Sequence, residues 1–234
     1  ALATCKLLGL DGIVAIGGDG TFRGALALSR QAAEHGNELQ VVGIPATIDN
    51  DIGCSHYTIG FDTACNTAIE CIDKLRDTMQ SHERCSVVEV MGRHAGYLAL
   101  CVGIAVGATA VLIPEREFDF DRDVVEPIRK SRLAGVTHFM VVVAEGAGSA
   151  VDIANRIKEE VGIDPRVTVL GHIQRGGTPS SRDRETASRM GYEAVMSLIQ
   201  GKGNRVIATQ EGSVVNLDME EALAMTKPFE MERY

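Results

Sequence analysis

Short apolar runs alternate with longer amphipathic stretches along most of the 234 residues. The runs are rich in β-branched side chains, whereas the longer stretches repeat apolar positions every three or four residues. These patterns predict strands at 13–17, 40–44, 86–90, 109–113, 137–143, 166–170 and 205–209. They predict helices at 20–35, 61–79, 95–105, 121–133, 151–161, 182–200 and 218–226. Such alternation is typical of an α/β protein with doubly wound, mainly parallel sheets in three α/β/α layers.

Two further apolar segments refine this pattern. The longest run, Leu98 to Ile113, has 16 residues and contains glycines at 103 and 107. Because a bilayer-spanning helix needs about 20 apolar residues, we interpret the run as a buried helix followed by a buried strand. The run from Ser213 to Leu217 follows a turn at Glu211-Gly212. This spacing predicts that the run pairs antiparallel with the strand at 205–209 and forms an edge hairpin.

Composition fits a large single domain or two smaller ones, with 45% hydrophobic and 24% charged residues. The net charge of −9 argues against a general nucleic-acid or membrane surface, so a phosphate site would have to concentrate arginine locally. The six cysteines have no C-x-x-C spacing, and we expect them to be reduced thiols. We therefore expect a cytoplasmic protein without nucleic-acid or membrane partners.

The first predicted strand, which we expect to be buried on both faces, ends in the glycine-rich segment Gly17-Gly18-Asp19-Gly20-Thr21. A helical pattern begins at once, so these residues form a tight strand-to-helix turn. The first N–H groups of a helix and its dipole bind phosphates, which assigns nucleotide contacts to Gly18, Gly20 and Thr21. Asp19 would repel a bare phosphate unless a divalent cation lay between them, so we predict that it binds Mg²⁺. The alternative is that Asp19 caps the helix.

The second predicted strand is followed by a loop, Thr47 to Gly53, that contains a hydroxyl and two carboxylates. We expect this loop at the same sheet edge as the glycine-rich turn. Asp49 and Asp51 would repel each other unless one approached the metal and the other took a proton from a substrate hydroxyl, as phosphoryl transfer requires. The alternative is a solvated loop with turn-forming acids.

The sequence resembles the ATP-dependent 6-phosphofructokinases of bacterial type, lacking the N-terminal part of that family. Four motifs in the family's order carry the resemblance: GGDGT at 17–21, PATIDND at 45–51, MGR at 91–93 and VLGHIQRGG at 169–177. The resemblance implies two lobes, a nucleotide and Mg²⁺ lobe of residues 1–60 with 173–223 and a sugar-phosphate lobe of residues 61–172 with 224–234. The family's first strand and a further glycine-rich loop would precede residue 1.

The implied reaction is glycolytic transfer of a phosphoryl group from ATP to the 1-hydroxyl of fructose 6-phosphate. By this resemblance Asp49 is the base, Asp19, perhaps with Asp51, holds Mg²⁺, Thr47 places the reacting groups and Arg93 steadies the phosphoryl group. Seven further residues would bind the sugar phosphate: Arg84, Met91, Gly92, Glu145, Arg166, His172 and Arg175.

The resemblance further implies which part of the sugar phosphate five of these residues bind, with Met91 and Gly92 lining the same end as Arg93. Arg84, Arg166 and His172 would hold the 6-phosphate, with both arginines reaching it from a neighbouring subunit of a homotetramer. Glu145 and Arg175 would bind the fructose hydroxyls. Taken singly, each arginine is more simply a solvated surface charge, and His172, between apolar residues, is equally a core or supporting histidine.

Two positions bear on the phosphoryl donor. Pyrophosphate-dependent relatives typically carry Asp at the position of Gly20 and Lys at that of Ala46, so the small residues here favour ATP. Pyrophosphate remains an alternative, as do a shortened, non-catalytic sugar-phosphate-binding subunit and a lipid or nicotinamide-dinucleotide kinase. The family's effector pocket for ADP and phosphoenolpyruvate is matched at Arg76 only, since Thr109, Ala134 and Val136 replace its charged residues.

Overall fold

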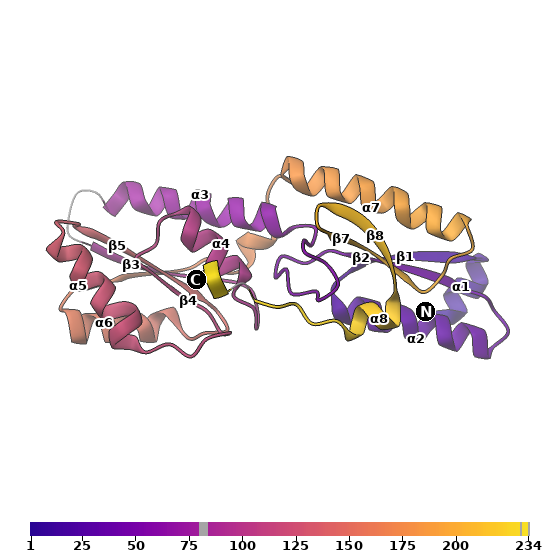
Figure 1. Cartoon of the computed structure of the whole chain (residues 1–234), viewed down its shortest axis with the longest axis horizontal. Coiled ribbons are helices and arrows are strands. Elements are labelled where there is room, and N and C mark those ends of the chain that lie inside the picture. Colours follow the sequence, from indigo (N-terminus) through magenta and orange to yellow (C-terminus); the bar gives the residue numbers. More distant parts are fainter. Residues whose placement is uncertain (80–83, 230, 234) are drawn as a thin grey trace. The chain divides into compact units, whose positions relative to one another are not determined.

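The computed structural model describes residues 1–79, 84–229 and 231–233. The chain divides into two compact units, each with its own sheet (Figure 1). Unit 1 comprises residues Ala1–Gly60 and Pro179–Pro228, and unit 2 comprises Phe61–Thr178 and Phe229–Tyr234. The chain therefore crosses between the units three times, after Gly60, Thr178 and Pro228.

Unit 1 contains a four-stranded sheet in the order β1-β2-β7-β8. The strands β1 (Gly12–Gly17), β2 (Gln40–Pro45) and β7 (Arg205–Gln210) run parallel, and β8 (Ser213–Asp218) pairs antiparallel with β7, as the hairpin prediction required. Helices α2 (Asp19–Glu34) and α8 (Met219–Ala224) cover one face, and α7 (Ser181–Ile199) covers the other (Figure 1). The short α1 (Leu2–Leu8) packs against α2.

Strand β1 is less buried than its apolar sequence predicts. It lies at the edge of the four-stranded sheet, and Ile16 is 63% exposed. In the central strand β2, by contrast, every residue from Val41 to Pro45 is buried. The prediction that the first strand is buried on both faces is thus wrong, because a continuous apolar run does not reveal where its strand lies in the sheet.

Unit 2 contains four parallel strands in the order β4-β5-β3-β6. Their bounds are β3 (Arg84–Val90), β4 (Ala110–Leu112), β5 (His138–Ala144) and β6 (Arg166–Val169). Helices α5 (Glu126–Leu133) and α6 (Ala150–Val161) contribute to the core on one face, whereas α3 (Phe61–Met79) and α4 (Tyr97–Ala105) lie over the other (Figure 1). Unit 2 also contains two 3₁₀ turns, η2 (Gly171–Arg175) and η3 (Met231–Arg233).

The apolar run Leu98 to Ile113 forms most of α4 and then β4, which confirms the prediction of a buried helix and strand. None of the helices in the described part of the chain combines the length and apolarity that crossing a membrane would require. All six cysteines are free thiols. Burial raises the pKa of Cys54 to about 11 and that of Cys85 to about 12, so both remain protonated at neutral pH.

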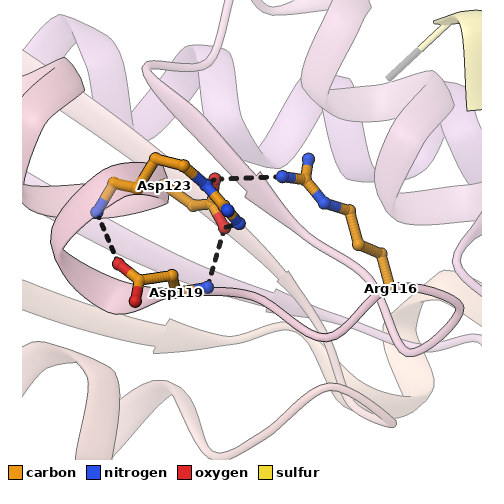
Figure 2. A network of polar contacts seen from close by, with 4 residues as sticks. Arg116, Asp119 and Asp123 are labelled. Carbon is orange, nitrogen blue, oxygen red and sulfur yellow. Dashed lines mark hydrogen bonds and ion pairs between the residues drawn. The ribbon is translucent and has the colours of Figure 1, made fainter.

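The helix predicted at 121–133 begins with a π-helical turn, η1 (Asp121–Val125), before α5 continues it. Figure 2 shows the polar network at this turn. Asp123, whose side chain is 11% exposed, accepts hydrogen bonds from Arg122 Nε at 2.8 Å and from Asp119 N–H at 2.8 Å, and Arg116 lies at 3.3 Å. The hydrogen bond from Arg122 is the main reason that the pKa of Asp123 is lowered.

Candidate active site

The glycine-rich turn and the TIDND loop meet at the carboxyl edge of the unit 1 sheet. Gly17 ends β1 and lies opposite Pro45, which ends β2. Beyond the strands, Ala46 N–H donates to the carbonyl oxygen of Gly17 at 3.0 Å. Parallel pairing in this register brings both motifs to one edge, as expected from the order of the strands.

The glycine-rich turn has one crowded position and two open ones. A Cβ on Gly17 would lie 2.3 Å from Thr21 Oγ1, so only glycine fits there without a shift. At Gly18 and Gly20 an added Cβ would meet no atom within 4 Å. Helix α2 starts at once, with Thr21 and Phe22 N–H bonded to the carbonyl oxygen of Gly18. The turn therefore exposes backbone beside a helix N-terminus, which suits an anionic ligand.

Asp19 is the first residue of α2, and its side chain is 52% exposed. Gly18 is the N-cap and makes no side-chain capping bond, so the interpretation of Asp19 as the capping residue is wrong. Instead, Asp19 Oδ2 accepts a hydrogen bond from Arg23 Nε at 2.7 Å. Such an exposed i,i+4 ion pair stabilises a helix by only about 0.3–0.5 kcal/mol, so a stronger partner can displace Arg23 at little cost.

The TIDND loop is held in place by buried polar side chains. Asn50, 7% exposed and with a positive φ of 52°, accepts a hydrogen bond on Oδ1 from Thr58 N–H at 3.1 Å. Thr58 Oγ1 donates to the carbonyl oxygen of Thr47 at 2.6 Å. Asp49 N–H donates to Thr47 Oγ1 at 3.2 Å. These hydrogen bonds fix the backbone of the loop on both sides of Asp49.

Within this loop the two carboxylates differ in environment, since Asp49 is half-buried and Asp51 is exposed. No cluster of three or more acidic, histidine or cysteine side chains forms a metal site among the residues placed in the structure. The donors present still fit Mg²⁺, because this ion takes one or two carboxylates and completes its shell with water and phosphate oxygens. Exposed Asp19, between the open positions Gly18 and Gly20, offers such a carboxylate.

In unit 2 the MGR segment follows β3 and meets Glu145, which follows β5. Glu145 Oε1 accepts hydrogen bonds from Gly92 N–H at 3.2 Å and Arg93 N–H at 2.6 Å. Gly92 and Arg93 both have positive φ, 142° and 56°, and a side chain at position 92 would collide with the backbone of Ala95. Glu145 thus stabilises a backbone conformation that costs a non-glycine residue about 1–3 kcal/mol. Arg93 itself is exposed.

The GHIQRGG segment forms the 3₁₀ turn η2 at the same edge of the unit 2 sheet. His172 and Arg175 are exposed on this turn, so His172 is not a core histidine. Gln174 is fully buried, accepts from Met91 N–H at 3.3 Å and donates to the carbonyl oxygen of Gly171 at 3.1 Å. Gln174, which motif reasoning did not single out, therefore links the turn to the end of β3.

The two remaining arginines begin their strands. Arg84 is the first residue of β3, and its side chain lies outside the described part of the structure. Arg166 is exposed, begins β6 and lies opposite Ser86. At about 3.3 Å per residue, the strand separates the Arg84 backbone from the end of β3 by roughly 20 Å, and it separates Arg166, which lies opposite Ser86, from that end by roughly 13 Å. Within unit 2 the backbones of these arginines thus lie at the amino ends of the strands, whereas the MGR and GHIQRGG segments follow the carboxyl ends.

Unit 2 also contains a cavity of about 430 Å³ near the amino ends of its strands. Arg76 lines it with Thr109, Val136 and His138, and the Arg76 guanidinium donates to the carbonyl oxygen of Val106. Among the described residues, the cavity thus combines one guanidinium and one imidazole with hydroxyl and apolar side chains. A ligand with several phosphate groups would find little positive charge on these walls.

Comparison with known proteins agrees with this architecture. The phosphofructokinase family model matches residues 1–198. The chain is 49% identical over 229 residues to an ATP-dependent 6-phosphofructokinase of Clostridium botulinum (strain Hall), covering 98% of this chain and 70% of that protein. A Bacillus cytotoxicus protein of the same name is 50% identical over 229 residues, with the same coverage.

Two solved structures extend the comparison. Phosphofructokinase from Saccharomyces cerevisiae superposes with a TM-score of 0.87 at 31% identity, over 95% of this chain and 33% of the yeast chain. A pyrophosphate-dependent phosphofructokinase from Marinobacter aquaeolei shares the fold, with a TM-score of 0.86 at 24% identity, over 99% of this chain and 64% of that one. The chain belongs to the phosphofructokinase family.

Proposed function

We propose that the protein containing this chain transfers the γ-phosphoryl group of ATP to the 1-hydroxyl of fructose 6-phosphate, giving fructose 1,6-bisphosphate in cytoplasmic glycolysis. The observation that carries the proposal is the meeting of the glycine-rich turn and the TIDND loop at one sheet edge, joined by the bond from Ala46 to Gly17. This arrangement offers a phosphate site and a carboxylate base on neighbouring backbone. The names of the Clostridium and Bacillus relatives support the same activity.

In this reaction Asp49 removes the proton from the attacking hydroxyl. A positioned base of this kind contributes about 10²–10⁴ in rate. The hydroxyl of Thr47, which accepts from Asp49 N–H, fixes the backbone beside the base. Thr47 would also place the reacting groups. Bound Mg²⁺ would neutralise charge on the nucleotide phosphates, held by Asp19 with Asp51 as a further candidate. The backbone of Gly18, Gly20 and Thr21 would receive the phosphates.

Unit 2 would hold the sugar phosphate. Exposed Arg93 steadies the transferring phosphoryl group, and Met91 and Gly92 line the same end. Glu145 and Arg175 would bind fructose hydroxyls, with Glu145 also fixing the Arg93 backbone as described above. His172, exposed on the same turn, would contact the 6-phosphate.

Arg84 and Arg166 would bind the 6-phosphate in the site of a neighbouring subunit. Their position at the amino ends of the unit 2 strands supports this assignment, because Arg93 follows the carboxyl end of β3. The assembly would be a homotetramer with sugar sites shared between copies.

ATP is the proposed donor. An added side chain at Gly20 would project into open space, where the aspartate of pyrophosphate-dependent relatives would stand. Gly20 leaves that space for a nucleotide phosphate, and Ala46 adds no charge.

The test uses the full-length protein with Mg²⁺, ATP and fructose 6-phosphate. Asp49→Ser should lower kcat by about 10²–10⁴ while the protein still binds the sugar phosphate. Asp11→Ser is the matched control, because Asp11 is exposed and precedes β1 at the other end of the sheet. Near-full turnover in Asp49→Ser would refute the assignment of the base.

The same assay separates the alternative functions. Turnover with pyrophosphate but not ATP would indicate the pyrophosphate-dependent reaction. Sugar-phosphate binding without turnover would indicate a non-catalytic subunit. Turnover only with a lipid or nicotinamide-dinucleotide acceptor would indicate a kinase of those classes.

A further inference from the structure

One buried carboxylate in unit 1 joins the loop of residues 46–60 to helix α7. Asp183 is 2% exposed and lies in the first turn of α7. Its Oδ1 accepts hydrogen bonds from Tyr57 OH at 2.5 Å and from Gly60 N–H at 2.7 Å. Removing a carboxylate from water is costly, so a carboxylate this buried must be compensated by such hydrogen bonds and by the positive end of the helix.

Tyr57 is fixed by its main chain as well as by its hydroxyl. Its N–H donates to Thr209 Oγ1 at 3.2 Å, and its carbonyl oxygen accepts from Ser55 Oγ at 2.6 Å. The guanidinium of Arg182 lies 4.2 Å from the centre of the tyrosine ring. These contacts allow the phenol one orientation, with its hydroxyl on Asp183.

The residue after Tyr57 carries this constraint to the candidate active site. Thr58 bonds the carbonyl oxygen of Thr47 through its hydroxyl and the side chain of Asn50 through its N–H. Thr47 in turn accepts the hydrogen bond from Asp49 N–H. A continuous series of contacts therefore connects the carboxylate of α7 with the loop that presents the proposed base.

Asp183 also bonds both the segment in which the chain leaves unit 1 and the segment in which it returns. Gly60 is the last residue of unit 1 before the chain enters unit 2, and the chain returns at Pro179. Ser180, the N-cap of α7, accepts a hydrogen bond from Asp183 N–H at 3.2 Å. One residue thus bonds the outgoing segment through its carboxylate and the returning segment through its N–H.

We propose that Asp183, acting through Tyr57 and Gly60, is a positioning residue that holds Thr47 and Asp49 in their catalytic orientation. This inference rests on the proposed function for its kinetic consequence. Because the proposed ligands of the 6-phosphate and of the other sugar hydroxyls belong to unit 2, loss of the Asp183 contacts should lower kcat and leave the KM for fructose 6-phosphate nearly unchanged.

The first test is Tyr57→Phe in the full-length protein, which removes one oxygen and retains the ring. We expect kcat to fall about 10-fold, since displacement of a reacting group by 1 Å costs up to about 10² in rate. The KM for fructose 6-phosphate should change less than about 2-fold. Tyr192→Phe is the matched control, because Tyr192 lies on α7 itself and is 64% exposed. It should leave kcat unchanged.

The second test is Asp183→Asn, which retains the shape and removes the charge. Asp152→Asn is its matched control, because Asp152 occupies the same position in α6, three residues after a serine N-cap, and is exposed. If Asp183 acts through Tyr57, the double variant that combines Tyr57→Phe with Asp183→Asn should lose little more activity than Asp183→Asn alone. A full additive loss, or a kcat unchanged in Tyr57→Phe, would overturn the proposal.

Amide hydrogen exchange supplies a readout that does not depend on activity. The amides of residues 46–60 should exchange faster in Tyr57→Phe than in the wild type, whereas those of unit 2 should be unaffected. If the wild type fails to phosphorylate fructose 6-phosphate, the proposed function fails, and this exchange result still decides whether Asp183 holds the loop. Unchanged exchange in the loop would overturn the positioning role.

Discussion

Gly146 follows Glu145 and packs against the turn that carries Arg93, although we assign it no contact with a ligand. A Cβ at this position would lie 2.3 Å from the carbonyl oxygen of Arg93 and 3.3 Å from its carbonyl carbon. Non-bonded heavy atoms normally approach to about 3.5 Å, so Gly146→Ala must move the Arg93 peptide by roughly 1 Å. The preceding peptide is held in place, because Arg93 N–H donates a hydrogen bond to Glu145.

Two losses follow from this displacement. Overpacking of this kind lowers the free energy of unfolding by about 1–3 kcal/mol. Misplacing Arg93 by 1 Å should lower kcat by up to about 100-fold, because the group that steadies the phosphoryl transfer no longer faces it. The kinetic loss should persist at temperatures where the variant is fully folded.

The assay combines urea unfolding with steady-state kinetics on the full-length protein. Gly191→Ala is the control, because Gly191 lies in α7, and a Cβ there would meet no atom within 4 Å. It should raise the free energy of unfolding by roughly 0.8–1.0 kcal/mol and leave kcat unchanged. A Gly146→Ala protein with kcat within about twofold of the wild type would refute the argument that Gly146 fixes Arg93.

Three further predictions concern stability and regulation. Gly43→Ala puts a Cβ 2.8 Å from the buried ring of Phe22 and should lower the free energy of unfolding by about 1–3 kcal/mol. Gly24→Ala, at an exposed position of α2, should raise the free energy of unfolding. Urea titration of both variants measures these changes. The pKa of Asp123 is lowered in the folded state, chiefly by the hydrogen bond from Arg122. The contribution of Asp123 to stability is therefore present above the ordinary aspartate pKa of about 3.9, and it disappears as the pH falls through the pKa of the folded state. Asp123→Asn should therefore be less stable than the wild type at pH 7, and the difference should shrink below about pH 4 in thermal unfolding. Finally, ADP and phosphoenolpyruvate should each change the initial rate less than about twofold, since a single guanidinium lines the described part of the cavity in unit 2. A larger response would contradict this.

The sequence predicted most elements to within two residues because strand and helix periodicities here are regular and the breaks carry glycine or proline. The meeting of the two motifs in unit 1 was also predictable, since parallel strands that end in glycine-rich or acidic loops place those loops at one edge. Local pattern does not report a strand's neighbours, which is why the exposure of Ile16 on the edge strand was missed. The π-helical turn at 121–125 was missed for a related reason, because its register has no apolar signature.

The supporting residues of the site were the hardest to find. Tyr57 and Asp183 are 126 positions apart, and their hydrogen bond depends on the pairing of β2 with β7 and the packing of α7 over that pair. Asn50 offered one local signal, since asparagine tolerates positive φ better than most residues. Gln174 offered none, because a polar residue in a charged, glycine-rich segment is usually exposed.

The interrupted connectivity of unit 1 has a consequence for how the protein is made. Residues 61–178 supply all four strands of the second sheet as one continuous stretch, so this unit can fold while the remainder is still being synthesised. Strand β2 must wait for its neighbour β7, which leaves the ribosome some 160 residues later. The sheet of unit 1 is therefore completed last, and until β7 arrives the unpaired edge of β2 is open to pairing with other chains.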